Sequence, residues 1–354
     1  MIARVTLDLA VRREFDYLIP NEMEHNVCDG TRVKVPFGSR EVLGVVTALL
    51  TESPHGNLRE IIKTVGRQAL VTPPILKLVR WISEYYCCAP EVAMKAVLPD
   101  AVRKEEEGWR ERLYVRALPQ HDKLPKLTKR QEDLWSIVEE WRELPLQELV
   151  RLAGTTSATI RKLEDKGLVS IAPQISERDP YAKEHILPTS PLELNDEQSV
   201  ALCSIVKAID CLAVSKDNEI EVKENGVFLL HGVTGSGKTE VYLQAIAHAL
   251  KQGKGAIVLV PEISLTPQTV ERFKARFSQG PLQTLVAVLH SHLSAGERHD
   301  EWHKIRQGRA RIVIGARSAV FAPVEPLGLV IVDEEHEHSY KQEEAPRYNA
   351  RDLA

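Results

Sequence analysis

The segment Gly232–Thr239 fits the phosphate-binding loop pattern G-x-x-x-x-G-K-[ST] at every position. In such a loop the glycines let backbone N–H groups converge on a triphosphate. The lysine reaches the β- and γ-phosphates, and the final hydroxyl binds Mg²⁺. Because the loop joins a strand to a helix, it restricts this part of the chain to an α/β nucleotide-binding fold. We expect ATP to contact every residue of the loop: Gly232, Val233, Thr234, Gly235, Ser236, Gly237, Lys238 and Thr239.

The residues on either side of the loop favour this interpretation over a glycine-rich turn that carries Lys-Thr by chance. Val227–Leu230 is apolar and is predicted to be a buried strand that enters the loop. Glu240–Ala247 is predicted to belong to the helix that leaves it. The positive end of that helix dipole would then be directed at the bound anion.

A second apolar run, Leu329–Val332, is typical of a fully buried parallel strand and is followed by Asp333–His336. A solvated acidic turn is the alternative, but such a turn does not require four preceding aliphatic residues. An acidic residue at the carboxyl end of a parallel strand is where a nucleotide-hydrolysing fold holds its metal. We therefore expect Asp333 to share Mg²⁺ with Thr239.

The composition is that of a soluble globular protein, with 43% hydrophobic and 27% charged residues. A length of 354 residues favours two or three domains. The net charge of −4 excludes a global basic field, so nucleic-acid binding would have to use local patches. The five cysteines show no C-x-x-C spacing and predict no metal site. We find no signal peptide and no run of membrane-spanning length, which predicts a cytoplasmic protein without a membrane partner.

Three domains are predicted along the chain. Residues 1–105 combine alternating strand patterns with a helix at 74–86, which indicates a small β-rich or barrel-like module. Residues 106–189 form a linker and a further domain. Residues 190–354 alternate apolar strands with helices, which predicts a parallel sheet that binds nucleotide at the carboxyl ends of its strands. The alternating stretches of the first domain are 2–7, 31–35, 44–49 and 58–65.

The middle domain has a helix-turn-helix pattern. Helices are predicted at 147–152 and 157–166, and Gly167–Val169 leads into a wing strand, which together favour a winged-helix domain. Three basic residues of the second helix could contact DNA phosphates. Many domains of this kind bind only protein, so both alternatives stay open. The three basic residues are Arg161, Lys162 and Lys166.

Further motifs accompany the phosphate-binding loop in a fixed order. They are Phe15–Tyr17, Val35–Gly38, Glu240–Tyr242, Pro261–Gln268, His290–Ser294, Gly315–Ala319, Asp333–His336, Ser339–Gln342 and Arg347–Asp352. With these motifs the chain resembles the primosomal protein N-prime family of bacterial replication-restart helicases, in superfamily two. The resemblance covers nearly the whole chain and is diffuse only in the linker and the middle domain. It implies a multidomain α/β fold: a small β-rich DNA-binding domain, a winged-helix domain and a first, incomplete RecA-like helicase lobe.

The resemblance implies roles around the nucleotide. Gln198 would read the adenine through its side-chain amide. Asp333 would hold Mg²⁺, and Glu334 would orient or deprotonate the attacking water. His336 would link hydrolysis to DNA engagement, and Lys238 completes the catalytic set.

The resemblance also implies contacts with single-stranded DNA. Small polar groups after the second strand would contact its phosphates without sequence preference. Tyr340 and Tyr348 belong to a loop that senses single-stranded DNA, where a ring can stack on any base. Ordinary packing is the alternative for both tyrosines. The remaining implied contacts are Ser264, Thr266, Gln268, Arg317, Lys341 and Arg347.

In the first domain the resemblance implies a pocket for the 3′-terminal nucleotide of a nascent leading strand. Its residues would be Phe15, Asp16, Tyr17, Gly38 and Arg59. A carboxylate suits this pocket because it can accept a hydrogen bond from a free 3′-hydroxyl. Arg59 stands near a position where the family often has lysine.

Members of this family continue past the position of Ala354 with a second RecA-like lobe, a zinc-binding cysteine-rich module and a C-terminal domain. The second lobe supplies arginine fingers, which are worth roughly 10³–10⁵ in rate. We therefore expect negligible ATP turnover by these 354 residues alone, and no zinc in them. In the family, a further strand lies between the strand that leads into Gly232 and the strand that leads into Asp333. Without this further strand, both of its neighbours would be left with unpaired backbone groups.

The resemblance implies an ATP-dependent 3′→5′ DNA helicase that recognises stalled or branched forks and initiates primosome assembly. Its partners would be fork and single-stranded DNA, primosome loader proteins and single-strand-binding protein, at forks near the nucleoid. The alternative is a non-enzymatic fragment that binds fork DNA without turning over ATP. A nucleoside kinase or transport ATPase would have no use for Glu334–His336 or Pro261–Gln268.

Overall fold

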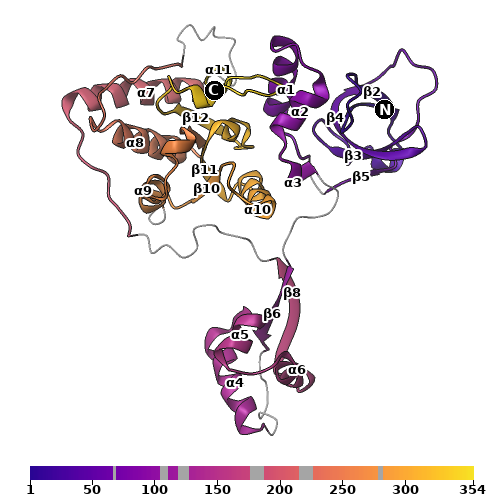
Figure 1. Ribbon diagram of the computed structural model, residues 1–354, viewed down its shortest axis with the longest axis vertical. Coiled ribbons are helices and arrows are strands. Elements are labelled where there is room, and N and C mark those ends of the chain that lie inside the picture. Colours follow the sequence, from indigo (N-terminus) through magenta and orange to yellow (C-terminus); the bar gives the residue numbers. More distant parts are fainter. Residues whose placement is uncertain (67–68, 104–110, 119–126, 176–186, 215–225, 278–281) are drawn as a thin grey trace. The chain divides into compact units, whose positions relative to one another are not determined.

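The computed structural model describes residues 1–66, 69–103, 111–118, 127–175, 187–214, 226–277 and 282–354. Contacts divide the chain into two compact units, one made of residues 1–107 with 180–354 and the other of 108–179 (Figure 1). The predicted boundary between residues 105 and 106 lies outside the described residues. Within those residues, no helix has both the length and the apolar character needed to cross a bilayer.

The first unit begins with an antiparallel sheet. In sheet order its strands are β2 (Phe15–Leu18), β1 (Ile2–Leu7), β4 (Arg40–Leu50), β3 (Arg32–Phe37) and β5 (Lys63–Thr64). A bridge between Leu18 and Glu60 joins β2 to the segment before β5, so the two edges of the sheet approach each other. Val5, Val33 and Val46 are buried inside it. The predicted small β-rich domain is confirmed, although β2 was not predicted as a strand.

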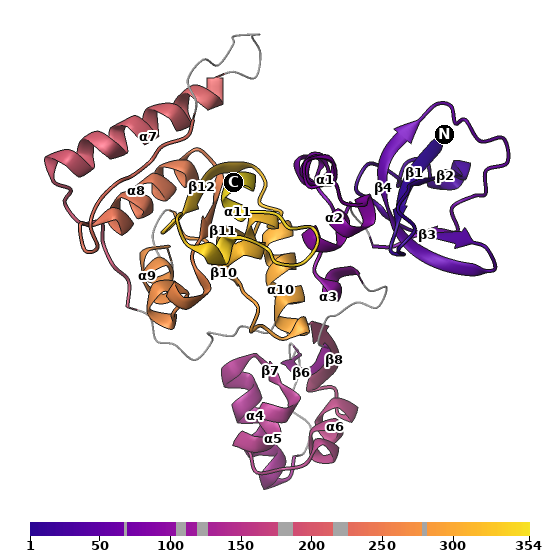
Figure 2. The ribbon, with the colours of Figure 1, turned by 45° about the horizontal axis from the view of Figure 1, so that its top comes forward.

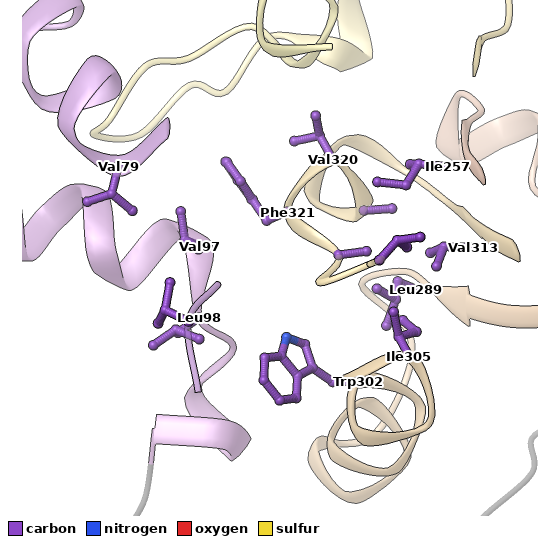
Figure 3. Packing of buried hydrophobic residues seen from close by; sticks show 14 of the residues in the cluster. Val79, Val97, Leu98, Ile257, Leu289, Trp302, Ile305, Val313, Val320 and Phe321 are labelled. Atoms are coloured by element: carbon purple, nitrogen blue, oxygen red, sulfur yellow. The ribbon is translucent and has the colours of Figure 1, made fainter. Parts of the chain in front are cut away.

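Three helices follow this sheet: α1 (Pro73–Tyr85), α2 (Pro90–Val97) and α3 (Asp100–Arg103). Both α1 and α2 begin at proline, whose fixed φ suits the first turn of a helix. Buried side chains of α1 and α2 join one apolar cluster with the nucleotide domain. Figure 3 shows Val97 and Leu98 on one side of this cluster, with Trp302 and Phe321 on the other. Residues 1–105 and 190–354 therefore share a core, although they were predicted as separate domains.

The second unit packs three helices on a small antiparallel sheet of order β7–β6–β8. A capping box between Thr128 and Gln131 starts its first helix. Leu134, Leu149 and Leu163 bring one buried side chain from each helix into its core. The predicted helix pair and the strand after it are both present. The elements are β6 (Glu111–Ala117), α4 (Lys129–Trp141), β7 (Glu143–Pro145), α5 (Leu146–Leu152), α6 (Ser157–Asp165) and β8 (Val169–Ile175).

The nucleotide domain is a parallel sheet covered on both faces. Its strands, in sheet order, are β10 (Leu285–Leu289), β11 (Ala310–Gly315), β9 (Gly255–Leu259) and β12 (Leu327–Val332). One face packs against α8 (Lys238–Lys251) and α9 (Pro267–Phe277), and the other against α10 (Ala295–Arg306) and η3 (Arg317–Phe321). The longest helix, α7 (Asp196–Val214), lies beside α8 (Figure 2). Shorter elements are η2 (Glu262–Ser264), η4 (His338–Tyr340) and α11 (Ala350–Leu353).

Two predictions about strands of this domain are wrong. Val227–Leu230 forms no strand, and most of its side chains are exposed. β12 forms as predicted, but it is half-buried and lies at the edge of the described sheet. The physical reason is pairing, because an apolar run becomes a strand only where a neighbour takes up its backbone hydrogen bonds. No described strand lies beyond β12 to pair with Val227–Leu230.

Candidate nucleotide and DNA sites

The phosphate-binding loop leads directly into α8. Gly235 and Gly237 have φ angles of 82° and 81°, which side chains other than glycine rarely adopt. The Lys238 ammonium lies over the loop and donates to the carbonyl oxygen of Gly232 at 2.6 Å. The first N–H groups of α8 have no acceptor within the helix, so they can bind an anion there. This geometry supports the predicted ATP contacts.

Gln198 lies against the same loop from the start of α7. Its Nε2 donates to the carbonyl oxygen of Ser236 at 2.8 Å. Its Oε1 accepts from the backbone N–H of Asn195 at 3.0 Å, while Asn195 Oδ1 accepts from the backbone N–H of Gln198 at 2.8 Å. A Cβ at Gly237 would lie 2.4 Å from Gln198 Nε2. The predicted adenine reader is therefore held beside the phosphate-binding loop, and Gly237 is needed for its close approach.

Glu240, in the first turn of α8, was missed as a site residue. Its carboxylate accepts two hydrogen bonds from the Arg276 guanidinium, at 2.9 and 2.8 Å, in an ion pair that is almost fully buried. Gln244 and the backbone N–H of Leu192 also donate to it. Burial alone would raise the pKa of Glu240, but these hydrogen bonds outweigh it and lower the pKa. Glu240 thus ties α8, α9 and the segment before α7 together. The only sequence signal was its place directly after the loop.

Asp333 follows β12 and is connected to the phosphate-binding helix. Tyr242, on α8, donates its hydroxyl to Asp333 Oδ1 at 3.2 Å. The Tyr340 hydroxyl lies 2.6 Å from the carbonyl oxygen of Asp333 and 3.0 Å from the carbonyl oxygen of Leu259. Burial raises the pKa of Asp333, against the hydrogen bond from Tyr242 and with added repulsion from Glu334. The two nucleotide motifs therefore meet at the carboxyl end of the parallel sheet.

The residues after Asp333 are more exposed. Glu334 has a φ of 47°, in the left-handed region that a residue with a side chain occupies only at some energetic cost. Its Oε2 lies 3.8 Å from Nε2 of His336. Backbone strain of this kind is concentrated at functional sites. The roles predicted for Glu334 and His336 stay predictions.

The residues present fit ATP and Mg²⁺. Mg²⁺ is usually bound by one or two carboxylates together with substrate phosphates and water, so it needs no dense cluster of protein ligands. Thr239 and Asp333 supply one hydroxyl and one carboxylate for it. Among the described residues, no group of three or more His, Cys, Asp or Glu side chains is placed to hold a metal. Lys238 and the N–H groups of the loop supply the positive charge that a triphosphate requires.

The predicted DNA contacts in the nucleotide domain fall into two sets. Thr266, Gln268, Lys341 and Arg347 are exposed, and the Lys341 ammonium donates to the carbonyl oxygen of Arg347. Their DNA contacts stay predictions. Ser264 is half-buried, and its carbonyl oxygen accepts from the hydroxyl of Thr269 at 3.0 Å.

Tyr340, Tyr348 and Arg317 have internal partners instead. Both tyrosines are buried, and the ring of Tyr348 packs edge-on against Phe321. The Arg317 guanidinium donates to the carbonyl oxygen of Lys341 at 2.7 Å. Neither tyrosine offers a ring face to a base in this structure, which favours the packing alternative, and stacking on DNA by these two residues stays a prediction.

Three of the five residues of the predicted 3′-end pocket belong to β2 and lie on its two faces, with Tyr17 buried in the core of the sheet. Alternation along the strand places Phe15 and Tyr17 on one face and Asp16 on the other. The Tyr17 hydroxyl donates to the Pro36 carbonyl oxygen at 3.2 Å, near the turn that contains Gly38. Arg59 donates to the carbonyl oxygen of Gly38 at 2.8 Å. Phe15 packs edge-on against Phe37 of the same turn, at a ring-centroid distance of 5.3 Å. Four of the five residues are therefore gathered around this turn.

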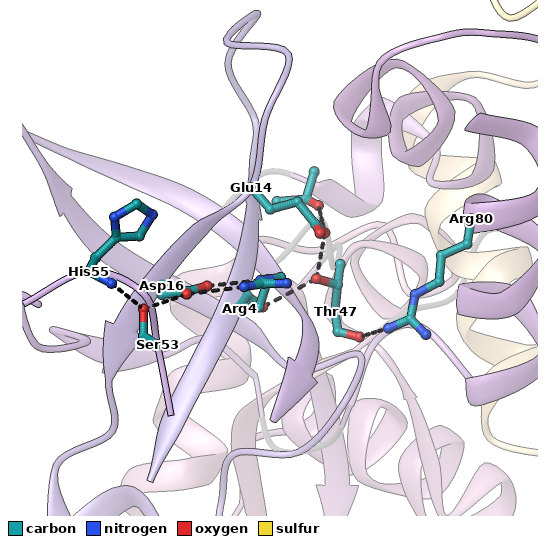
Figure 4. Close-up of polar contacts among 8 residues, drawn as sticks. Arg4, Glu14, Asp16, Thr47, Ser53, His55 and Arg80 are labelled. Carbon is teal, nitrogen blue, oxygen red and sulfur yellow. Dashed lines mark hydrogen bonds and ion pairs between the residues drawn. The ribbon is translucent and has the colours of Figure 1, made fainter. Parts of the chain in front are cut away.

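Asp16 belongs to a separate polar network on the other face (Figure 4). Arg4 donates to both of its carboxylate oxygens, at 2.9 and 3.2 Å, and the Ser53 hydroxyl donates at 2.7 Å. The hydrogen bond from Arg4, followed by that from Ser53, lowers the pKa of Asp16 against the effect of burial. Only 3% of the side chain is exposed. The carboxylate already accepts three hydrogen bonds and is almost fully buried, and its contact with a 3′-hydroxyl stays a prediction.

Comparison with known families places these sites in context. Residues 4–99 match the family described as the 3′DNA-binding domain of PriA, and residues 213–353 match the DEAD/DEAH box helicase family. Replication restart protein PriA of Bacillus subtilis is 36% identical over 425 aligned residues, which cover 99% of this chain and 51% of the relative. The protein of the same name from Haemophilus influenzae is 34% identical over 368 residues, which cover 100% of this chain and 47% of the relative. Over nearly its whole length the chain is similar to PriA proteins.

The chain spans about half the length of the curated PriA relatives that it matches. A Helicobacter pylori PriA is 43% identical over a shorter stretch of 155 residues, covering 44% of this chain. The two family matches fall on the antiparallel sheet with α1 and α2, and on the parallel sheet with its helices. The resemblance inferred from motifs is thereby confirmed.

Proposed function

We propose that this chain is the nucleotide-binding and fork-binding part of an ATP-dependent 3′→5′ DNA helicase of replication restart. It would recognise stalled or branched forks and begin primosome assembly, with loader proteins and single-strand-binding protein as partners. One observation carries the nucleotide half of this proposal. The hydrogen bond from Tyr242 to Asp333 joins the phosphate-binding helix to the acidic motif.

In the proposed site, Lys238 holds the β- and γ-phosphates, and Thr239 and Asp333 hold Mg²⁺. Mg²⁺, when bound, supplies positive charge that neutralises the phosphates. Glu334 orients or deprotonates the attacking water. Its exposed carboxylate and strained backbone support this role. His336, within 3.8 Å of Glu334, connects this carboxylate to the loop that follows.

In the first domain, we propose that Phe15, Tyr17, Gly38 and Arg59 hold the terminal nucleotide of a leading strand. Arg59 supplies the positive charge, and its bond to the Gly38 carbonyl fixes it beside the turn. Asp16 reads the 3′-hydroxyl by accepting its hydrogen bond.

We propose a winged-helix domain in the second unit, with α6 as its DNA-contacting helix. Arg161 and Lys162 are both exposed on α6. Lys166 is less suited to a phosphate contact, because its ammonium donates to Gln131 Oε1 at 2.9 Å. Arg161 and Lys162 are therefore the two residues of this domain that we assign to DNA phosphates.

Fork recognition is tested by comparing two forks that differ only at the leading-strand end, one with a 3′-hydroxyl and the other with a 3′-phosphate. Fluorescence anisotropy at a single salt concentration measures both affinities. We expect tighter binding of the 3′-hydroxyl fork, and loss of the difference in Asp16→Asn. Asp29→Asn removes an exposed carboxylate of the same domain and should keep the difference. Equal affinity of the wild-type chain for both forks would contradict the proposal.

The alternative, a fork-binding protein without ATP turnover, is separated by measuring phosphate release with fork DNA. Release that depends on DNA and is abolished by Lys238→Ala supports the enzyme. Fork binding with no Lys238-dependent release supports the alternative for these 354 residues.

A further inference from the structure

Helix α1 carries an exposed aromatic pair that its own packing does not require. Trp81 and Tyr85 lie one turn apart, with ring centroids 4.6 Å from each other and an interplanar angle of 12°. They are 38% and 63% exposed, respectively. The buried face of the same helix is formed by Leu76, Val79 and Ile82. The stacked rings are therefore presented to solvent in a preformed geometry.

A third ring connects this pair to the nucleotide domain. Tyr86 meets Trp81 and Tyr85 edge-on, at centroid distances of 5.9 and 4.9 Å. Its hydroxyl accepts a hydrogen bond from the backbone N–H of Asn349 at 3.1 Å. The Lys341 ammonium lies 5.3 Å from the centroid of the Tyr86 ring. The loop that contains Tyr340 and Tyr348 thus contacts the aromatic group of α1, while its own two tyrosines are buried.

Positive charge lies at both ends of this aromatic group. Lys77 is exposed on α1, four residues before Trp81, so it lies on the same face of the helix as the pair. Lys341 lies at the other end, over Tyr86. Stacked rings between cations are the arrangement that binds single-stranded nucleic acid, because every base has a face to stack and every phosphate is anionic.

We propose that Trp81 and Tyr85 form a base-stacking platform for single-stranded DNA, with Lys77 and Lys341 contacting the phosphates on either side. The platform rests on the proposed DNA function of the chain and assigns a base-stacking role to α1. Through Tyr86, a strand bound on α1 contacts the same loop that follows Asp333 and Tyr340. The loop therefore meets DNA through the rings of α1.

The test measures binding of a circular oligothymidylate, which has no 3′ end and so cannot occupy the 3′-end pocket. The complete 354-residue chain is titrated at constant salt by fluorescence anisotropy. We expect Tyr85→Ala to weaken binding by at least about five-fold, since loss of one base–aromatic stack has effects of that size or larger. Tyr85→Phe, which keeps the ring, should stay within about two-fold of wild type.

Trp141→Ala is the matched control, since Trp141 is an exposed aromatic residue on α4 and is 58% exposed. It should bind the circle like wild type. A circle of abasic sites gives a second readout, because wild type should bind it as weakly as Tyr85→Ala does. Unchanged binding of the thymidylate circle by both Trp81→Ala and Tyr85→Ala would overturn the platform while leaving fork recognition intact. Failure of the wild-type chain to bind any DNA would instead overturn the proposed function with it.

Discussion

Glu240→Gln removes the charge from a carboxylate that four hydrogen bonds hold at the start of α8. The side chains of Glu240 and Arg276 are only 10% and 8% exposed, so solvent screens their attraction weakly. Removing one partner of a buried ion pair costs about 3–5 kcal/mol, because the other charge is left buried and unpaired. Glutamine keeps the shape and one acceptor oxygen. We therefore expect Glu240→Gln to lower the free energy of unfolding of the nucleotide domain by about 3 kcal/mol, the low end of that range.

The pH dependence of this effect has a definite sign. The pKa of Glu240 is lowered in the folded protein, because its hydrogen bonds outweigh burial. The pair therefore contributes its full stability above the unfolded value of about 4.3. That contribution is lost as pH falls through the lower, folded pKa. The difference in the free energy of unfolding between wild type and Glu240→Gln should be largest at neutral pH and should become smaller below about pH 4.

Hydrogen exchange of peptides from α8 and α9 measures this local stability in the complete chain. Glu271→Gln, which neutralises an exposed carboxylate on α9, should change it by less than about 0.5 kcal/mol. Replacing both Glu240 and Arg276 by methionine should leave the stability nearly unchanged, because the double variant contains no buried, unpaired charge. Two results would refute the reasoning. One is a loss of stability below about 1 kcal/mol for Glu240→Gln at pH 7, and the other is a loss of stability that does not become smaller in acid.

Two further perturbations follow from the structure. Asp16→Asn should destabilise β1 and β2 by about 1.5–2 kcal/mol at pH 7 in hydrogen exchange, discounted because Arg4 is partly exposed. This loss of stability should become smaller in acid, because the pKa of Asp16 is lowered in the folded protein. An equal loss of stability in Asp29→Asn would contradict the prediction. Gly237→Ala combines a φ of 81° with a Cβ 2.4 Å from Gln198 Nε2, so ATP affinity should fall about ten-fold. Gly253→Ala has a φ of 75° with open space around it and should leave ATP affinity within about two-fold, which calorimetry can check.

Local patterns predicted much of the fold because they depend on neighbouring residues. Alternation located β1, β3 and β4, and the glycine and lysine spacing located the phosphate-binding loop with α8 behind it. Val227–Leu230 was predicted wrongly because an apolar run does not reveal whether a partner strand lies beside it. The same limit explains why β12 is half-buried.

The candidate sites show a similar division. Loop residues such as Lys238 could be predicted because their chemistry is contained in one segment. The pair between Glu240 and Arg276 spans 36 positions, and the bond between Ser53 and Asp16 spans 37, so no local pattern indicates either. Tyr340 was predicted to meet DNA, but its environment is set by Leu259, far away in the sequence. Strand alternation alone could have placed Asp16 opposite Phe15.

The central claim is that the phosphate-binding loop and Asp333 form one Mg²⁺–ATP site. Isothermal titration of ATP into the complete chain, with Mg²⁺ and then with EDTA, tests it most directly. We predict that Lys238→Ala abolishes binding. We also predict that wild type binds more tightly with Mg²⁺ than with EDTA, and that this difference disappears in Asp333→Asn. Equal ATP affinity for wild type and Lys238→Ala, or an unchanged Mg²⁺ effect in Asp333→Asn, would contradict the account.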